Sequence, residues 1–240
     1  GPNQPVGVAE SISPRMKERW LRLRRWNARR RGVLEPLAAF LSEPAPSLRT
    51  TFGDTEFVSL DIETTGLDAN ADEMLSVGWV VIRGGKVDLS TAHSYLVRPS
   101  GEVGSSASIH GLTDTVVGEG HDSEIVLDRI VEELGGRALL VHHAGLDKLL
   151  LDRMCRQRYG APLLVPCVDT LALELRRQKR KHHIDEQRSL RLGDLRTAYQ
   201  LPRYNAHDCL VDAIATAELL IAMVAHNGGA KGTRLRDLTV

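Results

Sequence analysis

Two carboxylates stand at the end of an apolar segment, VSLDIETTGLD, at residues 58–68. Because side chains alternate between the two faces of a strand, we expect Asp61 and Glu63 on one face and Ile62 on the other. Two carboxylates so placed can hold a divalent cation through oxygen ligands. The small residues that follow, TTG, offer backbone N–H groups where a ligand approaches closely. A pair of solvated acids at an exposed strand end is the alternative interpretation.

More acids and one histidine follow along the chain. Asp147 lies in VHHAGLDKLLL at residues 141–151, and HDCLVDA at residues 207–213 contains His207 and Asp212. Five residues correspond to about 500° of helical rotation, so His207 and Asp212 do not share a helix face. We therefore expect His207 just before a helix and Asp212 inside it.

These residue types suit the hydrolysis of a phosphodiester, which needs an activated water and neutralisation of negative charge. Two divalent ions about 4 Å apart supply both. The four acids balance the charge of two such ions, and magnesium or manganese is the natural choice for an all-oxygen site. A histidine at a loop edge can accept the proton of the water near neutral pH.

The same segments resemble the motifs of the DnaQ-like 3′–5′ exonucleases, typified by the epsilon proofreading subunit of bacterial DNA polymerase III. DIETTGL is similar to the first motif, VHHAGLDKLLL to the second and HDCLVDA to the third in its histidine (DEDDh) form. SIHGLTD, at residues 108–114, is similar to the HGIT segment found between the first two motifs. The resemblance covers about residues 54–226 and departs from the family at His143 and Leu146, where asparagine and phenylalanine are common.

The resemblance implies roles for particular residues. Asp61 would bridge two metal ions, Glu63 and Asp212 would hold the ion that carries the attacking water, and Asp147 would serve the second ion. His207 would be the general base. Two further segments would meet the terminal nucleotide: Thr64, Thr65, Gly66 and Leu67, and His110, Gly111, Leu112 and Thr113. The implied cofactors are two divalent ions, Mg²⁺ or Mn²⁺.

The expected activity is metal-dependent 3′–5′ hydrolysis of single-stranded DNA ends, with release of nucleoside 5′-monophosphates. An exoribonuclease or a short-oligonucleotide trimming enzyme is the alternative among enzymes, because the same motifs serve both sugars. From another class, the chain could be a nucleic-acid-binding or partner-docking protein built on an inactive exonuclease scaffold. A proofreading subunit would co-purify with a polymerase, but the tail after His226 is short, so we do not expect a stable polymerase association.

The pattern along the chain favours an α/β fold: a mixed five-stranded sheet with helices on both faces, of the ribonuclease H-like type that the resemblance implies. Three strands with a Gly84-Gly85 hairpin turn are followed by alternating strands and helices. The proline-bearing SEPAPS linker divides the chain into a basic helical extension (1–48), a catalytic domain (49–226) and a short tail (227–240).

Composition narrows the class of protein. The 240 residues are 42% hydrophobic and 26% charged, as in globular domains. Three cysteines without a CxxC pair exclude a disulfide framework and fit a reducing compartment, so we expect a cytoplasmic protein without a membrane span. The net charge is zero, but it is divided into +6 for residues 1–50, −12 for 51–147 and +6 for 148–240. An acidic centre between basic flanks suits a cation-loaded site beside a polyanion.

Two basic segments lie outside the motifs. Residues 13–31 predict an amphipathic helix in which Trp20 and Trp26 stand among arginines, able to bind nucleic acid, an acidic protein partner or an anionic membrane. We expect this helix to fold back, burying its Trp, Leu and Met stripe and exposing its arginines. The second segment contains five basic residues: Arg176, Arg177, Lys179, Arg180 and Lys181. One interpretation is that it binds along a phosphate backbone, and the other is that it forms a solvated basic face. QRSLRL at 187–192 resembles a clamp-binding pattern, but we expect its leucines in the core.

Overall fold

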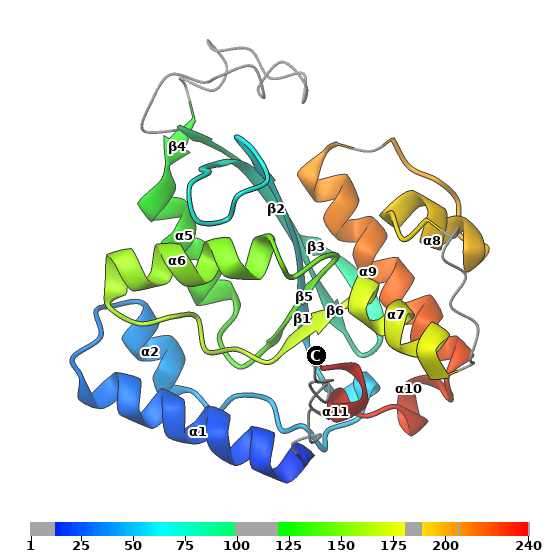
Figure 1. The fold of residues 1–240 in the computed structure, drawn as a ribbon, viewed down its shortest axis with the longest axis horizontal. Helices are drawn as coiled ribbons and strands as arrows, with labels where there is room; N and C mark the ends of the chain where they lie inside the picture. The colour runs from blue at the N-terminus through cyan, green and yellow to red at the C-terminus, as the bar shows by residue number, and fades with distance from the viewer. Residues whose placement is uncertain (1–12, 99–119, 181–188, 206, 240) are drawn as a thin grey trace, which may run out of the picture.

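The computed structural model describes residues 13–98, 120–180, 189–205 and 207–239. A six-stranded mixed sheet runs in the order β4-β3-β2-β1-β5-β6, with helices on both faces (Figure 1). The α/β class and the mixed sheet are confirmed. The predicted count of five strands was wrong, because β4 (His121–Asp122) adds a sixth by pairing with the end of β3. Two residues are too few to show an alternating pattern.

The elements have the following bounds. The other strands are β1 (Phe57–Thr64), β2 (Met74–Arg83), β3 (Lys86–Arg98), β5 (Ala138–Val141) and β6 (Cys167–Asp169). The helices are α1 (Pro14–Arg30), α2 (Leu37–Ser42), the 3₁₀ turn η1 (Phe52–Asp54), α5 (Ser123–Glu133), α6 (Asp147–Tyr159), α7 (Thr170–Arg180), α8 (Leu192–Ala198), α9 (Cys209–His226), α10 (Gly229–Gly232) and α11 (Leu235–Leu238).

Strand β1 lies inside the sheet, antiparallel to β2 and parallel to β5. The β2–β3 hairpin turns at Gly84 and Gly85, whose φ angles are +58° and +73°. Positive φ at both central turn residues is what a tight hairpin requires, so the predicted turn is confirmed. Strand β5 pairs only with Phe57–Ser59, whereas β2 pairs along the whole of β1, so the C-terminal end of β1 is paired on the β2 side.

The two faces of β1 pack against different cores. Val58, Leu60 and Ile62 join a core with buried residues of α5 and α6. Phe57 belongs to the opposite core, which contains buried residues of α9. Alternation along the strand therefore turns Asp61 toward the α9 side.

Helix α9 has the length and composition of a membrane-crossing helix, with a mean hydropathy of 1.7 over 18 residues. Half of that window is buried in the protein, including Leu219 and Leu220, which are 0% exposed. A core helix packed on a sheet meets the same criteria, so α9 owes its apolar character to packing.

Helix α1 folds back onto the chain through an unexpected face. Leu21, Arg25 and Ala28 point inward. The Arg25 guanidinium donates hydrogen bonds to the carbonyl oxygens of Leu164 (2.6 Å) and Glu43 (2.8 Å), and also to that of Phe40. Burial lowers the pKa of Arg25 to about 10.

The apolar stripe of α1 consequently remains at the surface. Met16, Trp20, Leu23 and Trp26 are 50–58% exposed. The prediction that this stripe is buried was wrong, because a buried guanidinium that satisfies three carbonyl groups fixes the rotation of the helix. Helical periodicity identified the apolar stripe, but it could not show which side of α1 packs against the rest of the protein.

The end of the described chain also packs on the body. Isolated bridges join Thr51 to Arg234 and Val168 to Thr239, and Leu235 and Leu238 are buried. The boundaries at residues 48 and 226 stay a prediction.

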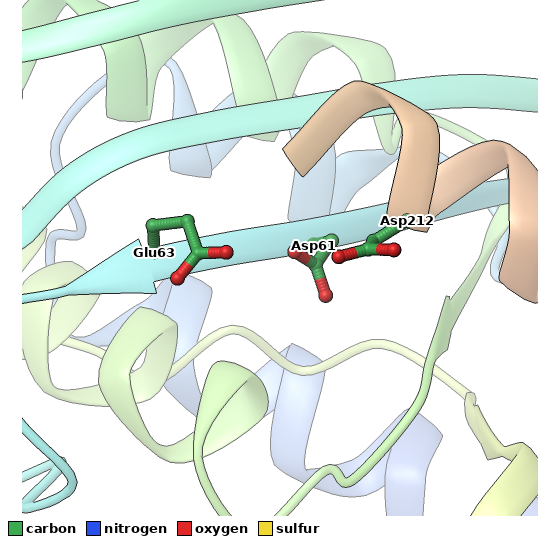
Figure 2. A group of neighbouring side chains, drawn as sticks. All are labelled: Asp61, Glu63 and Asp212. Atoms are coloured by element: carbon green, nitrogen blue, oxygen red, sulfur yellow. The ribbon is translucent and has the colours of Figure 1, made fainter. Parts of the chain in front are cut away.

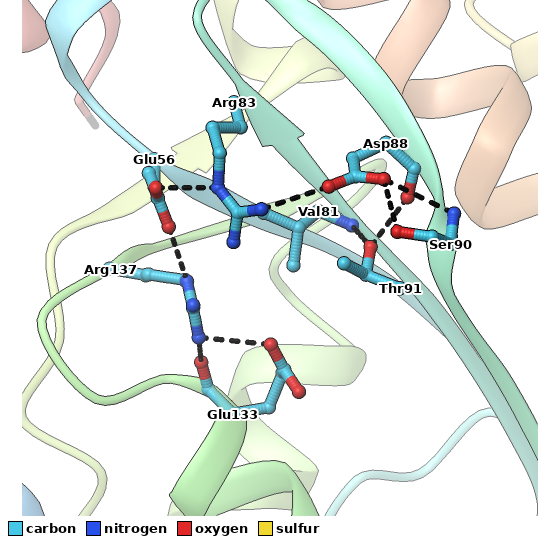
Figure 3. A network of polar contacts seen from close by, with 8 residues as sticks. All are labelled: Glu56, Val81, Arg83, Asp88, Ser90, Thr91, Glu133 and Arg137. Carbon is cyan, nitrogen blue, oxygen red and sulfur yellow. Dashed lines mark hydrogen bonds and ion pairs between the residues drawn. The ribbon is translucent and has the colours of Figure 1, made fainter.

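A charged network joins β1 to its neighbours at the end remote from Asp61. Glu56 accepts hydrogen bonds from Nε of Arg83 (2.7 Å) and Nε of Arg137 (2.8 Å) (Figure 3). Hydrogen bonds from Arg83 and then Arg137 lower the pKa of Glu56 below its usual 4.5. Since the ionised form is favoured by folding, the stabilisation is present above the unfolded-state pKa and is lost as pH falls through the folded-state pKa.

We expect Glu56→Gln to lower the free energy of unfolding by about 1 kcal/mol at pH 7, as for partly exposed ion pairs. The difference from the wild type shrinks as the pH is lowered from 7 toward 3, because protonation of Glu56 removes its ion pairs with Arg83 and Arg137. Urea denaturation of both proteins at pH 7 and at pH 3 measures this difference in the free energy of unfolding. The control is Glu132→Gln, in an exposed pair with Arg129, which should cost less than about 0.5 kcal/mol. An undiminished difference at pH 3 contradicts the assignment.

Candidate active site

Three carboxylates meet at the C-terminal end of β1 (Figure 2). Asp61 and Glu63 come from β1, and Asp212 comes from the first turn of α9. One oxygen of each lies within 4.8 Å of the others, and all three residues are half-buried. We call these three residues the acidic cluster. Asp61 and Glu63 share a face, as the alternation predicted.

The loop before α9 places His207 beside the acidic cluster. The backbone N–H of His207 donates a hydrogen bond to a carboxylate oxygen of Asp212 at 3.0 Å. Asp208 caps the helix by accepting from the N–H groups of Leu210 and Val211. His207 therefore precedes the helix and Asp212 lies inside it, as the five-residue spacing predicted. The His207 side chain is exposed.

Close contact between α9 and β2 fixes the position of Asp212. Gly78 of β2 pairs with Asp61 of β1, and a Cβ atom on Gly78 would lie 2.3 Å from the backbone nitrogen of Leu210. Only glycine permits this approach. Gly78 was not among the residues predicted from the sequence, although a glycine within an apolar strand signals a close backbone approach.

We expect Gly78→Ala to push the start of α9 away from the sheet and to separate Asp212 from Asp61. Overpacking costs about 1–3 kcal/mol of stability, and displacement of a catalytic group by about 1 Å costs about 100-fold in rate. Thermal denaturation and a nuclease assay measure the two effects. Gly193→Ala is the control, because a Cβ there meets nothing within 4 Å. A Gly78→Ala protein with the stability and rate of the wild type contradicts this role.

Two buried polar side chains that were also not predicted from the sequence hold the segments carrying the acids. The Ser59 hydroxyl donates to the carbonyl oxygen of Ala213 at 2.7 Å and so ties β1 to α9. The Asp169 carboxylate accepts from the backbone N–H groups of His143 (3.0 Å) and Ala144 (2.9 Å). It thereby shapes the loop that leads to α6. Neither residue lies in a recognisable spacing pattern.

Asp147, the first residue of α6, stands beside the acidic cluster. It is 4% exposed, and the backbone N–H of Ile62 donates to its carboxylate. Its oxygens are not within the 4.8 Å group formed by the other three acids. Asp147 therefore offers a separate ligand position next to the cluster.

Crowding and burial disfavour negative charge on these acids. Burial, followed by the charges of Asp147, Asp212 and Glu63, raises the pKa of Asp61 well above its usual value. Burial also raises the pKa of Asp147, to about 8, and that of Asp212. A divalent cation removes the repulsion between such carboxylates, and its preferred ligands are oxygens. The donor set therefore fits a divalent metal site.

The predicted substrate-contacting segment continues from β1 into a tight loop. Thr64 is buried and donates to the carbonyl of Gly66, while the Thr65 hydroxyl donates to the Asp72 carboxylate at 2.8 Å. A Cβ on Gly66 would lie 2.6 Å from that carboxylate, so a side chain there would displace the Asp72 carboxylate. Leu67 is 90% exposed. The other predicted contacts lie outside the described residues: His110, Gly111, Leu112 and Thr113.

His142 and two arginines of the second basic segment have structural partners. The His142 ring nitrogens lie 2.7 Å from the Thr170 hydroxyl and 3.1 Å from the Leu190 carbonyl, and burial lowers its pKa. Arg177 pairs with Glu174 at 2.9 Å. Arg176 donates to the carbonyls of two C-terminal residues, Leu238 and Thr239. Leu190 and Leu192 pack against a small core around Leu195, whereas Lys181 lies outside the described residues.

Comparison with known proteins places this site in a family. The exonuclease family model (RNase_T) matches residues 58–220, which include the acidic cluster, Asp147 and His207. The chain belongs to the exonuclease family. The resemblance to DnaQ-like exonucleases that the motifs indicated is thereby confirmed.

Curated relatives of this chain are much longer proteins. DNA polymerase III PolC-type of Thermotoga maritima is 30% identical over 209 residues, which are 83% of this chain and 15% of that protein. A putative bifunctional exonuclease/endonuclease protein of Mycobacterium tuberculosis is 29% identical over 195 residues, 76% of this chain and 28% of its own length. The chain spans less than a third of the length of these relatives.

Solved structures confirm the ribonuclease H-like fold of this chain. The zinc-bound complex of E. coli exonuclease I with single-stranded DNA aligns with a TM-score of 0.62 at 18% identity, covering 76% of this chain and 42% of that one. Exonuclease X in complex with 5′ overhanging duplex DNA aligns with a TM-score of 0.55 at 22% identity, covering 75% and 99%.

Proposed function

We propose that this chain is a metal-dependent 3′–5′ exonuclease of the DEDDh type that removes nucleotides from single-stranded DNA and releases nucleoside 5′-monophosphates. The acidic cluster, with His207 at its rim in an exonuclease-family chain, is the observation that carries the proposal. The complex of exonuclease I with single-stranded DNA supports that substrate.

In this proposal Asp61, Glu63 and Asp212 would hold a divalent ion, and Asp147 would offer a further carboxylate ligand beside them. Magnesium and manganese suit these all-carboxylate ligands. When bound, such ions supply an acidified water and neutralise charge on the phosphate. The protein contributes fixed positions for the ligands: β1 sets the spacing of Asp61 and Glu63, and the close approach at Gly78 sets that of Asp212.

His207 is proposed to accept the proton of the attacking water. Its ring is exposed at the start of α9, and its backbone is held to Asp212. A bond forms between the water oxygen and phosphorus while the bond from phosphorus to the 3′ oxygen of the preceding nucleotide breaks. That oxygen takes up a proton and becomes the new 3′-hydroxyl, and the mononucleotide leaves with a 5′-phosphate. A histidine near neutral pH can accept and return one proton in each cycle.

The loop after β1 is proposed to meet the terminal nucleotide. Leu67, exposed beside the acids, offers an apolar contact for the terminal base. Thr64, Thr65 and Gly66 contact the nucleotide mainly through their backbone groups in this proposal. The two threonine hydroxyls already donate hydrogen bonds within the loop, and the Asp72 carboxylate fills the space beside Gly66.

Labelled single-stranded substrates test the proposal. DNA and RNA 20-mers carrying a label at the 5′ or the 3′ end are incubated with the protein in magnesium, in manganese and in EDTA. We expect the 5′ label to report a descending ladder and the 3′ label to appear at once as a mononucleotide, with no reaction in EDTA. The DNA/RNA rate ratio assigns the sugar. Release of the 5′ label as a mononucleotide, or no cleavage in either metal, contradicts the proposal.

A further inference from the structure

The outward face of α1 combines aromatic rings with positive charge. Trp20 and Trp26 are 58% and 50% exposed. The guanidinium carbon of Arg24 lies 4.4 Å from the centre of the Trp20 ring, and that of Arg30 lies 4.6 Å from the centre of the Trp26 ring. A flat ring beside a guanidinium plane is the kind of surface on which unpaired nucleic-acid bases stack.

A hollow of about 460 Å³ adjoins the first turn of α1. Four arginines from three segments line it, and we call them the arginine hollow: Arg15, Arg49, Arg234 and Arg236. Glu18 is its single acidic residue, and that carboxylate accepts a hydrogen bond from Arg22 at 2.7 Å.

The guanidinium groups of the arginine hollow are poorly neutralised. Arg15 and Arg49 make no ion pair with any residue of the four described ranges. Arg234 donates to the uncharged backbone carbonyl of Arg49 at 2.9 Å, and Arg236 lies 3.6 Å from Asp237. Like charges held around one concavity favour an anion between them.

These features favour a single-stranded polyanion. A second copy docking through the same face would bring arginines against arginines. A flat membrane surface would leave the concave arginine hollow unfilled, and an acidic protein would not need stacked rings. Phosphates in the hollow and bases on the tryptophans use both features together.

We propose that the outward face of α1 and the arginine hollow form a second contact for the single-stranded nucleic acid, remote from the acidic cluster. In Figure 1, α1 crosses the bottom of the molecule while α9, which carries Asp212, starts near the top. This contact binds the nucleic-acid strand at a distance from its reacting 3′ end. It therefore favours long substrates, and the substrate class rests on the proposed function.

Two double variants test this contact separately. Arg15→Glu/Arg49→Glu changes the charge of the arginine hollow, and Trp20→Ala/Trp26→Ala removes the rings. Lys86→Glu/Arg129→Glu is the matched control, since it makes the same charge change at exposed residues on β3 and α5. Thermal denaturation confirms that each variant is folded. Fluorescence anisotropy then measures binding of a labelled thymidine 30-mer in EDTA over a range of salt concentrations.

We expect the arginine variant to bind the 30-mer at least tenfold more weakly. Its log–log salt slope should fall by about 1.4, because each single-strand phosphate contact contributes about 0.7. The tryptophan variant should bind about tenfold more weakly with an unchanged salt slope. In magnesium, the ratio of kcat/KM for the 30-mer to that for a trinucleotide should fall in both variants but not in the control.

Other outcomes distinguish failure of the second contact from failure of the proposed exonuclease activity. Equal 30-mer affinity in wild type, variants and control overturns the second contact, even if the trinucleotide is hydrolysed. If the double variants lose binding to vesicles with 30% phosphatidylglycerol but still bind the 30-mer, the second contact is overturned in favour of a membrane-binding surface. Conversely, variant-sensitive 30-mer binding without hydrolysis by the wild type supports the second contact while the proposed exonuclease activity fails.

Discussion

Asp61→Asn is expected to abolish hydrolysis of single-stranded DNA, with a fall of about 1,000-fold or more, since metal ions supply several kcal/mol of transition-state stabilisation. Asp61 lies within 4.8 Å of both other members of the acidic cluster, and after burial the charges of Asp147, Asp212 and Glu63 raise its pKa. Removing the charge of Asp61 therefore weakens the binding of the proposed divalent ions. Initial rates on a 5′-labelled 20-mer measure the loss.

The same variant should lose the stabilisation by metal. In the wild type, magnesium or manganese at about 100 times its Kd adds about 2.7 kcal/mol, which corresponds to a rise in Tm of about 5–10 °C for a chain of this size. Asp61→Asn should show no rise, and its Tm in EDTA should not fall below that of the wild type, because repulsion between buried carboxylates is removed.

Glu132→Gln is the control for both measurements, because Glu132 lies on the exposed side of α5 in a pair with Arg129. It should keep the rate and the metal-dependent Tm of the wild type. An Asp61→Asn protein that hydrolyses DNA at the wild-type rate would show that the acidic cluster is not the catalytic centre.

His207→Ala is expected to lower kcat by about 100- to 10,000-fold, the range for loss of a general base. Metal binding should survive, because Asp212 and its position on α9 are retained. The variant should therefore show the wild-type rise in Tm with magnesium while turnover is lost. Because the His207 side chain is exposed, added imidazole should restore part of the activity.

His143→Asn is the matched control. His143 is an exposed histidine near the site with a φ of +90°, a conformation that asparagine tolerates well. Its rate should stay close to that of the wild type. If His207→Ala also keeps the wild-type rate, or if it loses the metal-dependent Tm rise, the assignment of His207 as a general base is wrong.

Local geometry explains why much of the site could be predicted from the sequence. The period of two in a strand places Asp61 and Glu63 on one face, and the helical period separates His207 from Asp212. Both relations hold within a few residues and do not depend on the rest of the fold. The hairpin at Gly84 and Gly85 was predictable for the same reason.

Relations between distant segments were not predictable. The exposed stripe of α1 depends on carbonyl groups near residues 40, 43 and 164 that accept from Arg25. The need for Gly78 depends on the path of α9, and the role of Asp169 depends on the loop at His143. A single sequence gives the residue types but not these partners, so buried polar contacts over long sequence separations were missed.

Hydrolysis in ¹⁸O-labelled water tests the central claim most directly. Wild-type protein in excess over a single-stranded DNA 20-mer is mixed with magnesium, and the products are analysed by mass spectrometry, with Asp61→Asn alongside. Water attack at the terminal phosphodiester predicts nucleoside 5′-monophosphates carrying one ¹⁸O each in the phosphate, an unlabelled 3′-hydroxyl on the shortened strand, and no product from the variant. Nucleoside 3′-monophosphates, label on the remaining strand, or equal product from Asp61→Asn would contradict the assignment of this site.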